Sequence, residues 1–158
     1  MKKISLLLMC LFPAGLWAHC EVPCGIYNDA ARIMALGEHI TTIEKAMAKI
    51  EKLAGNQDAQ SMNQIIRWVN TKETHAEKIQ KIISVYFLTQ RIKPVKKDSK
   101  EYGLYISRTL LLQQILVSAM KCKQTVDIDY AIKTQQLINA FSDLYLDEHG
   151  REHLEKIR

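Results

Sequence analysis

The sequence contains no stretch in which apolar and polar residues alternate for long enough to predict a β-strand. It also lacks internal repeats, low-complexity tracts and any block of basic residues interleaved with aromatic ones. Without such a block, the formal net charge of +5 gives no reason to expect nucleic-acid binding. This mild positive excess would suit a small anionic substrate, and solvated lysines on helix faces explain it equally well.

A long apolar run is missing too. The run near the start, Ile4 to Phe12, is shorter than the stretch of about 20 residues that a membrane-spanning helix needs. Two lysines precede this run and the small residue Ala18 follows it, which predicts a signal peptide over residues 1–18 that is cut before His19. We therefore expect an exported protein, periplasmic or secreted, and an uncleaved membrane anchor is the alternative.

Cysteines are few, and their number argues against a disulfide framework. Cys10 lies within the signal peptide, which leaves Cys20, Cys24 and Cys122, an odd number for a compartment that oxidises thiols. Residues 19–158 suffice for one domain that buries an apolar core without disulfides. Cys122 is expected to be a half-buried helix residue without a chemical role.

What the chain has in abundance is helical periodicity. In the first helical segment, which ends at Gly55, the apolar residues recur at spacings of three and four. This seam consists of Ile33, Leu36, Ile40, Ile43, Met47 and Ile50. Further helices are predicted over about 58–92, 104–123 and 128–147. Short links between four amphipathic helices predict an all-α, up-and-down four-helix bundle over about 29–147, followed by a charged tail at 148–158.

Individual positions in these helices carry further expectations. The second seam runs from Met62 to Tyr86 and is apolar except for Lys72, while the fourth helix is expected to bury Ile128 and Ile132. His39 is expected to be a polar residue on the first helix. In the charged tail, His149 and His153 have the spacing of a zinc-binding helix pair, but Gly150 is expected to interrupt that helix, which favours solvated histidines.

The segment "HCEVPCGIY", residues 19–27, concentrates metal-binding groups directly behind the predicted cleavage site. Cleavage would free the α-amine of His19 and add it to the His19 imidazole, the two thiolates of Cys20 and Cys24 and the Cys20 backbone nitrogen. Two thiolates, an amine and an amide in one plane suit nickel(II) or copper(II), whereas zinc prefers a tetrahedron. On cysteine spacing alone, a small disulfide loop is the alternative.

This segment resembles the start of the nickel-containing superoxide dismutases, which carry it at a processed N-terminus ahead of a four-helix bundle. The matching positions are His19, Cys20, Pro23, Cys24, Gly25 and Tyr27. The resemblance continues in "ARI" at 31–33, in "KETHAE" at 72–77 and in the spacing of the later helices. It thus covers nearly all of the mature chain, most strongly in residues 19–27, which would form a metal-binding hook.

The resemblance implies one nickel ion per subunit and a homohexamer, with superoxide as substrate. The His19 amine, the Cys20 amide and the Cys20 and Cys24 sulfurs would bind nickel in a plane, with the His19 imidazole axial in Ni(III). Tyr27 would lie over the open face and position substrate or water without binding metal. Ni(III)/Ni(II) cycling would convert two superoxide anions and two protons into oxygen and hydrogen peroxide.

Two positions depart from the family pattern. Members of the family commonly carry a glutamate and an arginine that tether the axial histidine, and Met34 and His75 stand at those places here. Glu38 or Glu73 are the candidates to rebuild such a tether. The alternative function is an exported nickel or copper carrier that uses the same hook for binding without turnover.

Overall fold

The computed structural model describes residues 27–157, and within this range it contains helices and no strand. The prediction of an all-α protein is therefore confirmed. The helices are α1 (Asp29–Leu53), α2 (Ala59–Lys81), the π-helix η1 (Ile82–Arg91), α3 (Tyr102–Gln124), α4 (Ile128–Tyr145) and α5 (Glu148–Ile157). No helix in the described range is long and apolar enough to cross a membrane.

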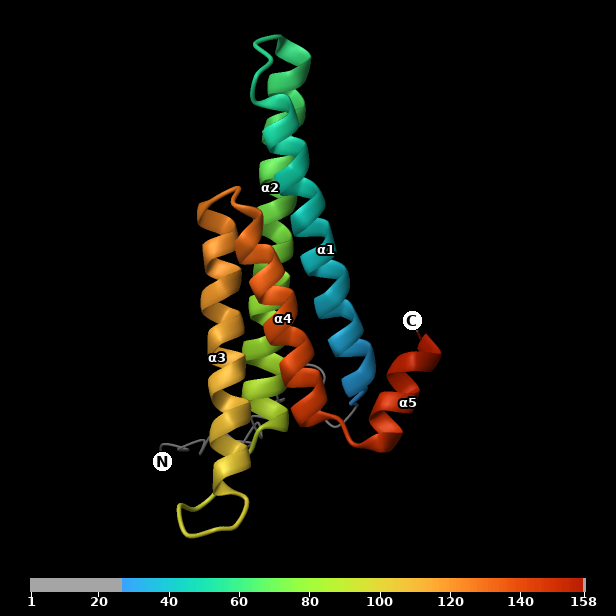
Figure 1. The fold of residues 1–158 in the computed structure, drawn as a ribbon, viewed down its shortest axis with the longest axis vertical. Coiled ribbons are helices and arrows are strands. Elements are labelled where there is room, and N and C mark those ends of the chain that lie inside the picture. The colour runs from blue at the N-terminus through green and yellow to red at the C-terminus, as the bar shows by residue number, and fades with distance from the viewer. Residues whose placement is uncertain (1–26, 158) are drawn as a thin grey trace, which may run out of the picture.

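Four long helices form the predicted up-and-down bundle (Figure 1). The first hairpin joins α1 to α2 and the second joins α3 to α4. The α1–α2 hairpin extends beyond the α3–α4 turn at one end of the bundle, while the loop between η1 and α3 closes the other end. We call the end that carries the start of α1 the base of the bundle.

The start of α1 is fixed by local chemistry. The Asn28 side chain accepts a hydrogen bond from the backbone N–H of Ala31 at 2.9 Å, which satisfies one of the unpaired donors of the first turn. All six predicted seam residues of α1 are buried, so this seam is confirmed. Because the cap directly follows Tyr27, the helix fixes the backbone close to that residue.

The second helix changes its winding near the base. From Ile82 onward it is a π-helix, in which the hydrogen bonds join residues five apart, as in the 2.8 Å bond from Ile92 N to Phe87 O. In an α-helix, residues five apart lie almost one and a half turns from each other. The π winding instead places Tyr86 and Arg91 on one side of the helix, where both contact Asp29.

Some predicted core positions are wrong. Met62 is 50% exposed because it lies near the start of α2, in the part of the hairpin that extends beyond α3 and α4 (Figure 1). Ile128 and Ile132 are also exposed, since α4 buries a different stripe that includes Ala131 and Ile138. The expectation of a half-buried Cys122 is wrong as well, because this residue is fully buried on α3.

Residues 148–157 form a packed helix, so the expectation that Gly150 interrupts a helix is wrong, while His149 is exposed as expected. Leu154 of α5 is buried and Ile157 packs against the core, which holds α5 along α1. Gly150 lies inside the helix at the tight junction with α4, where an added Cβ would meet the Leu146 side chain at 3.0 Å. The absent side chain therefore allows this turn.

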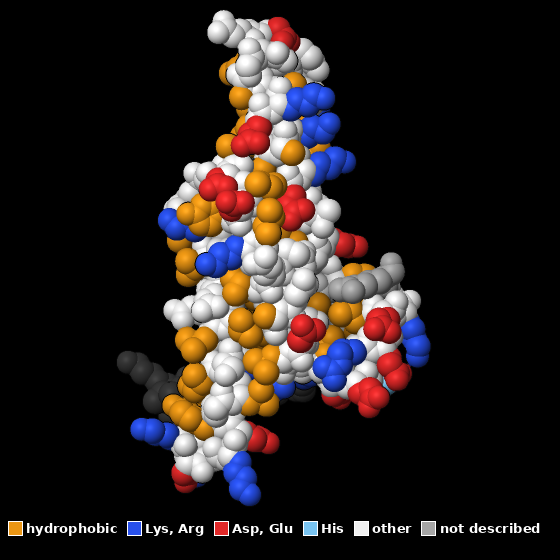
Figure 2. Space-filling view, in the orientation of Figure 1, with side chains coloured by type: hydrophobic (Ala, Val, Ile, Leu, Met, Phe, Trp, Pro, Cys, Tyr) orange, Lys and Arg blue, Asp and Glu red, His pale blue; other side chains and the backbone are white. Residues whose placement is uncertain are grey.

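The α3–α4 face leaves a run of apolar side chains exposed. Figure 2 shows them along the side of the bundle that these two helices form. They include Leu110, Val117, Met120, Ile128 and Ile132. An exposed apolar surface of this kind is typical of contact with another protein surface.

Candidate metal centre

The three candidate ligands, His19, Cys20 and Cys24, lie outside the described residues. Tyr27 is the predicted site residue that the structure describes, and it lies at the base of the bundle beside the start of α1. We use the name Tyr27 platform for this residue and those that surround it there. They are Tyr27, Asp29, Tyr86, Arg91 and Tyr145.

Tyr27 is held by two side chains of η1. The Arg91 guanidinium lies over its ring, 4.4 Å from the ring centroid, in cation–π geometry. The edge-to-face partner is Tyr86, with ring centroids 5.9 Å apart and planes at 75°. Because 42% of Tyr27 remains exposed, its ring is anchored at the base and still accessible from outside.

Asp29 is the hydrogen-bonding centre of the platform. Its carboxylate accepts hydrogen bonds from the Tyr86 hydroxyl and from the Tyr145 hydroxyl, the latter at 2.9 Å. Arg91 donates to it twice, from Nε at 2.9 Å and from Nη2 at 2.6 Å. A paired guanidinium and carboxylate in this two-point arrangement make a directional contact. One carboxylate on α1 thereby binds side chains from η1 and α4.

These contacts set the protonation of the platform. Burial raises the pKa of the Asp29 carboxyl, but hydrogen bonds from Arg91, Tyr86 and Tyr145 outweigh that effect and hold the pKa below its usual value. Burial and the hydrogen bond to Asp29 raise the pKa of Tyr145 to about 12, and they raise the pKa of Tyr86 as well. Both hydroxyls therefore remain protonated donors at neutral pH.

A pocket of about 540 Å³ opens beside Tyr27, between the start of α1 and the start of α5. Arg91 and Arg108 line it, and Arg108 also donates a 3.0 Å hydrogen bond from Nη2 to the carbonyl of Leu144. His149 and His153 reach the same pocket from α5. The packed helix thus brings these two histidines close to the predicted site, rather than leaving them in a tail.

The two departures from the family pattern occupy different surroundings. Met34 packs against the core and lines a second pocket together with Ile157 of α5. His75 meets His39 edge-on, with ring centroids 4.9 Å apart, and its buried Nδ1 has no hydrogen-bond partner among the described residues. Neither residue contacts the Tyr27 platform through any hydrogen bond in that range.

The two glutamates proposed to rebuild the tether are also accounted for. Glu73 binds Lys72 at 3.3 Å and lies 3.7 Å from Lys123, at the end of α3 that is remote from the base. Glu38 is exposed on α1 beside the second pocket. Of the described side chains, it is thus Asp29, rather than either glutamate, that is bonded into the surroundings of Tyr27.

The donor chemistry indicates where a metal would bind. Among the described residues, no cluster of three or more histidine, cysteine, aspartate or glutamate side chains could hold a metal ion. Residues 19–24 supply two thiols, an imidazole and the amine that cleavage would free. This soft and nitrogen-rich set fits nickel, because thiolates favour transition metals over magnesium or calcium.

A helical bundle preceded by this donor set defines a class of metal-binding proteins with a helical scaffold. The chain belongs to the nickel-containing superoxide dismutase family, whose model matches residues 15–149. It is accordingly an oxidoreductase of superoxide with a nickel cofactor. Searches of curated proteins and of solved structures gave no match.

Four residues of the platform were not predicted as site residues. Tyr86 could be predicted as a core residue, because it ends the seam of the second helix. Its contacts with Asp29 and Tyr27 could not be predicted. Asp29, Arg91 and Tyr145 come from three separate segments, and their pairing depends on the π winding of η1 and on the bundle. A charged residue two positions after Tyr27 was the one local signal.

Proposed function

We propose that this protein dismutates superoxide at a nickel ion held by the hook, with the His19 amine, the Cys20 amide and the Cys20 and Cys24 thiolates as ligands. The observation that carries the proposal is the family match over residues 15–149, which encloses the hook. Nickel, when bound there, supplies a one-electron couple between Ni(III) and Ni(II). The net reaction converts two superoxide anions and two protons into oxygen and hydrogen peroxide.

In this proposal the protein's own residues hold the hook and orient the substrate. The His19 imidazole would supply a further nitrogen ligand, and the Tyr27 hydroxyl would position substrate or water. The anchoring of the Tyr27 ring by Arg91 and Tyr86 supports this role, since a fixed ring keeps its hydroxyl in one place. Tyr27 binds no metal in this arrangement.

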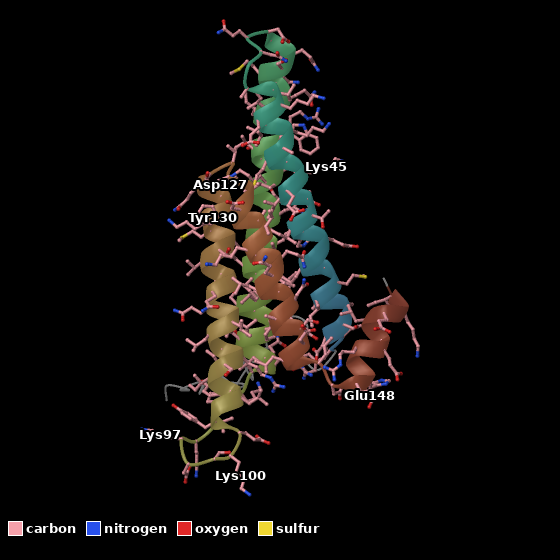
Figure 3. The ribbon with its side chains drawn as sticks, in the orientation of Figure 1. Lys45, Lys97, Lys100, Asp127, Tyr130 and Glu148 are labelled. Carbon is pink, nitrogen blue, oxygen red and sulfur yellow. The ribbon has the colours of Figure 1, made fainter. Side chains whose placement is uncertain are left out.

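The charge at the base of the bundle supports an anionic substrate. The loop between η1 and α3 carries four lysines against two acidic residues, and Figure 3 shows Lys97 and Lys100 projecting from it. In the pocket beside Tyr27, Arg91 and Arg108 face Asp29 and Asp147, so the excess of positive charge lies in this loop. Positive potential near a site raises the encounter rate of an anion, and salt weakens this effect.

Export and assembly complete the proposal. Cleavage of residues 1–18 frees the His19 amine, so the site is completed in the periplasm or after secretion. Superoxide crosses lipid poorly because it is charged. An exported enzyme would therefore act on the superoxide that forms outside the cytoplasm. The exposed apolar side chains of the α3–α4 face support assembly with further copies, as a homohexamer.

An exported nickel or copper carrier remains the second candidate function, because the same donors could hold a metal without turnover. The anchored Tyr27 favours the enzyme, since a carrier has no use for an aromatic hydroxyl fixed beside the metal. Turnover of superoxide by the nickel-loaded protein distinguishes the two.

The test is to add one residue ahead of His19 in the processed protein. This extension converts the primary amine into an amide, and we expect dismutation to fall to the uncatalysed background while helical circular dichroism stays unchanged. The matched control carries the same extension as the end of a protease recognition sequence that is cut directly before His19, so that cleavage regenerates the His19 amine and restores activity. Full activity in the extended form would contradict the proposed ligand set.

A further inference from the structure

Asp29 gathers the charged and aromatic side chains around Tyr27. Its two oxygens accept from Arg91, Tyr86 and Tyr145, so donors from η1 and α4 converge on one carboxylate of α1. Arg91 is itself 30% exposed and Asp29 is 20% exposed, which places this ion pair at the rim of the core rather than inside it.

The two side chains that hold Tyr27 are both bound to Asp29. The Arg91 guanidinium covers one face of the Tyr27 ring, and Tyr86 meets the ring edge-on. If the carboxylate is removed, Arg91 loses its two-point partner and keeps the Tyr145 hydroxyl as an acceptor at 3.1 Å, and the Tyr86 hydroxyl loses its acceptor. The position of Tyr27 therefore depends on Asp29, although no hydrogen bond between the two side chains is present.

The chain order makes this dependence important for the hook. Tyr27 lies three residues after Cys24 and two residues before Asp29, with the α1 cap at Asn28 between them. An exposed tyrosine adds little to the core, so the packing around it serves mainly to fix its position. Residues that lie behind the ligands of a metal site act in this way, because they orient the groups that bind the ion.

We infer that Asp29 is a positioning residue of the metal centre: through Arg91 and Tyr86 it fixes Tyr27, and through Tyr27 it holds the end of the nickel hook against the bundle. The inference rests on the proposed function for its nickel part. Its geometric part concerns described residues alone and can be tested without metal.

The experiment compares Asp29→Asn with Arg91→Gln in the processed full-length protein. Both variants break the ion pair, but Arg91→Gln keeps the negative charge in the first turn of α1, so a shared effect cannot come from loss of that charge. Asp143→Asn, an exposed acidic residue on α4, is the matched control. Arg91→Gln also removes the direct contact of Arg91 with Tyr27, so Asp29→Asn, which keeps Arg91, carries the test of Asp29.

Two measurements are made on each protein. The Tyr27–Tyr86 contact is followed without metal by nuclear Overhauser effects in tyrosine-labelled protein. Nickel affinity is followed by thiolate-to-nickel absorption in competition with a chelator. We expect both variants to lose the contact and to bind nickel about 10- to 100-fold more weakly, as for other losses around metal ligands, with the control unchanged.

The outcomes separate the inference from the proposed function. A retained Tyr27–Tyr86 contact in Asp29→Asn would overturn the positioning role, whatever the nickel result. If the Tyr27–Tyr86 contact is lost but the nickel affinity stays within twofold of the parent, Asp29 has a structural role alone. This result would also overturn the inference. Failure of the parent protein to bind nickel would refute the proposed function, and with it the nickel part of the inference.

Discussion

Two cations are tied into the bundle at its opposite ends, and they differ in what holds them. At the base, Arg91 binds the Asp29 carboxylate and lies on the Tyr27 ring. Toward the other end, Lys72 is 3% exposed and donates 2.6 Å hydrogen bonds to the backbone carbonyls of Cys122 and Lys123. These carbonyls belong to the last turn of α3, where a helix has unpaired acceptors and favours positive charge.

The comparison separates a structural cation from one that belongs to a site. Lys72 binds backbone atoms of a helix end, so its role is to join α2 to α3. Arg91 binds side chains, and one of them, Tyr27, is exposed and leads directly into the hook. A side chain that is held by several others yet remains accessible indicates a function beyond folding.

Lys72→Met removes the cation at the end of the bundle remote from the base. Of the variants considered, it should have the largest effect on stability. The substitution keeps the apolar stem but leaves two α3 carbonyls without their donor, so we expect the free energy of unfolding to fall by about 2–3 kcal/mol. Urea unfolding measures this change. Nickel affinity should stay within twofold, and a large loss of nickel binding would mean that the two ends are coupled.

Lys123→Met is the matched control for this variant. Its ammonium group lies 3.0 Å from the exposed Glu77 and 3.7 Å from Glu73, in a surface network that water screens. We expect a change below about 0.5 kcal/mol, as for other exposed ion pairs.

Tyr145→Phe tests the base with a smaller change. The variant removes one hydroxyl that donates to Asp29 at 2.9 Å, while its ring can still stack on Phe141. We expect a loss of about 1 kcal/mol in stability and a rise in the pKa of the Asp29 carboxyl, since one stabilising donor is gone. Chemical shifts of the Asp29 carboxyl against pH measure the second effect. Tyr130→Phe, near the other end of α4 (Figure 3), is the control and should leave that pKa unchanged.

The pair of His39 and His75 lies between the two ends of the bundle. We expect it to leave the free energy of unfolding unchanged at neutral pH and to lower it increasingly in acid. Burial, His75 and Lys78 lower the pKa of His39 to about 4, from an ordinary value of 6.5. As the pH falls through this window, the unfolded chain takes up a proton that the folded protein resists, so the free energy of unfolding decreases. His39→Gln should make the loss between pH 6.5 and 4 smaller. Urea unfolding across this range checks it, with the exposed His149→Gln as control, and an unchanged slope would contradict the prediction.

The sequence was sufficient to predict the four long helices of the bundle because their determinants are local. The spacing of Ile33, Leu36 and Ile40 predicts the buried face of α1, and the structure confirms it. The motif around Tyr27 likewise predicts the family, because metal donors next to a predicted cleavage site form a compact and specific pattern, and the family match confirms it. Lys72 could be placed on a seam, but its partners at the end of α3 could not.

The platform itself could not be predicted, for physical reasons. Asp29 and Tyr145 are 116 residues apart, and their contact exists because α1 and α4 are neighbours in the bundle. The pairing of Tyr86 with Arg91 needs π winding, which periodicity at about 3.6 residues does not indicate. The packing of α5 could not be predicted either. Its residues are mostly charged, and the two apolar residues that dock it, Leu154 and Ile157, are too few to form a recognisable apolar face.

The position of α5 beside Tyr27 matters while the chain is being synthesised, because α5 is the last of the described helices to be made. The pocket beside Tyr27 takes one wall from the first described helix to be synthesised and another from the last. Translation therefore makes Tyr27 and α1 well before α5, so this pocket is complete only once the last described helix has been made.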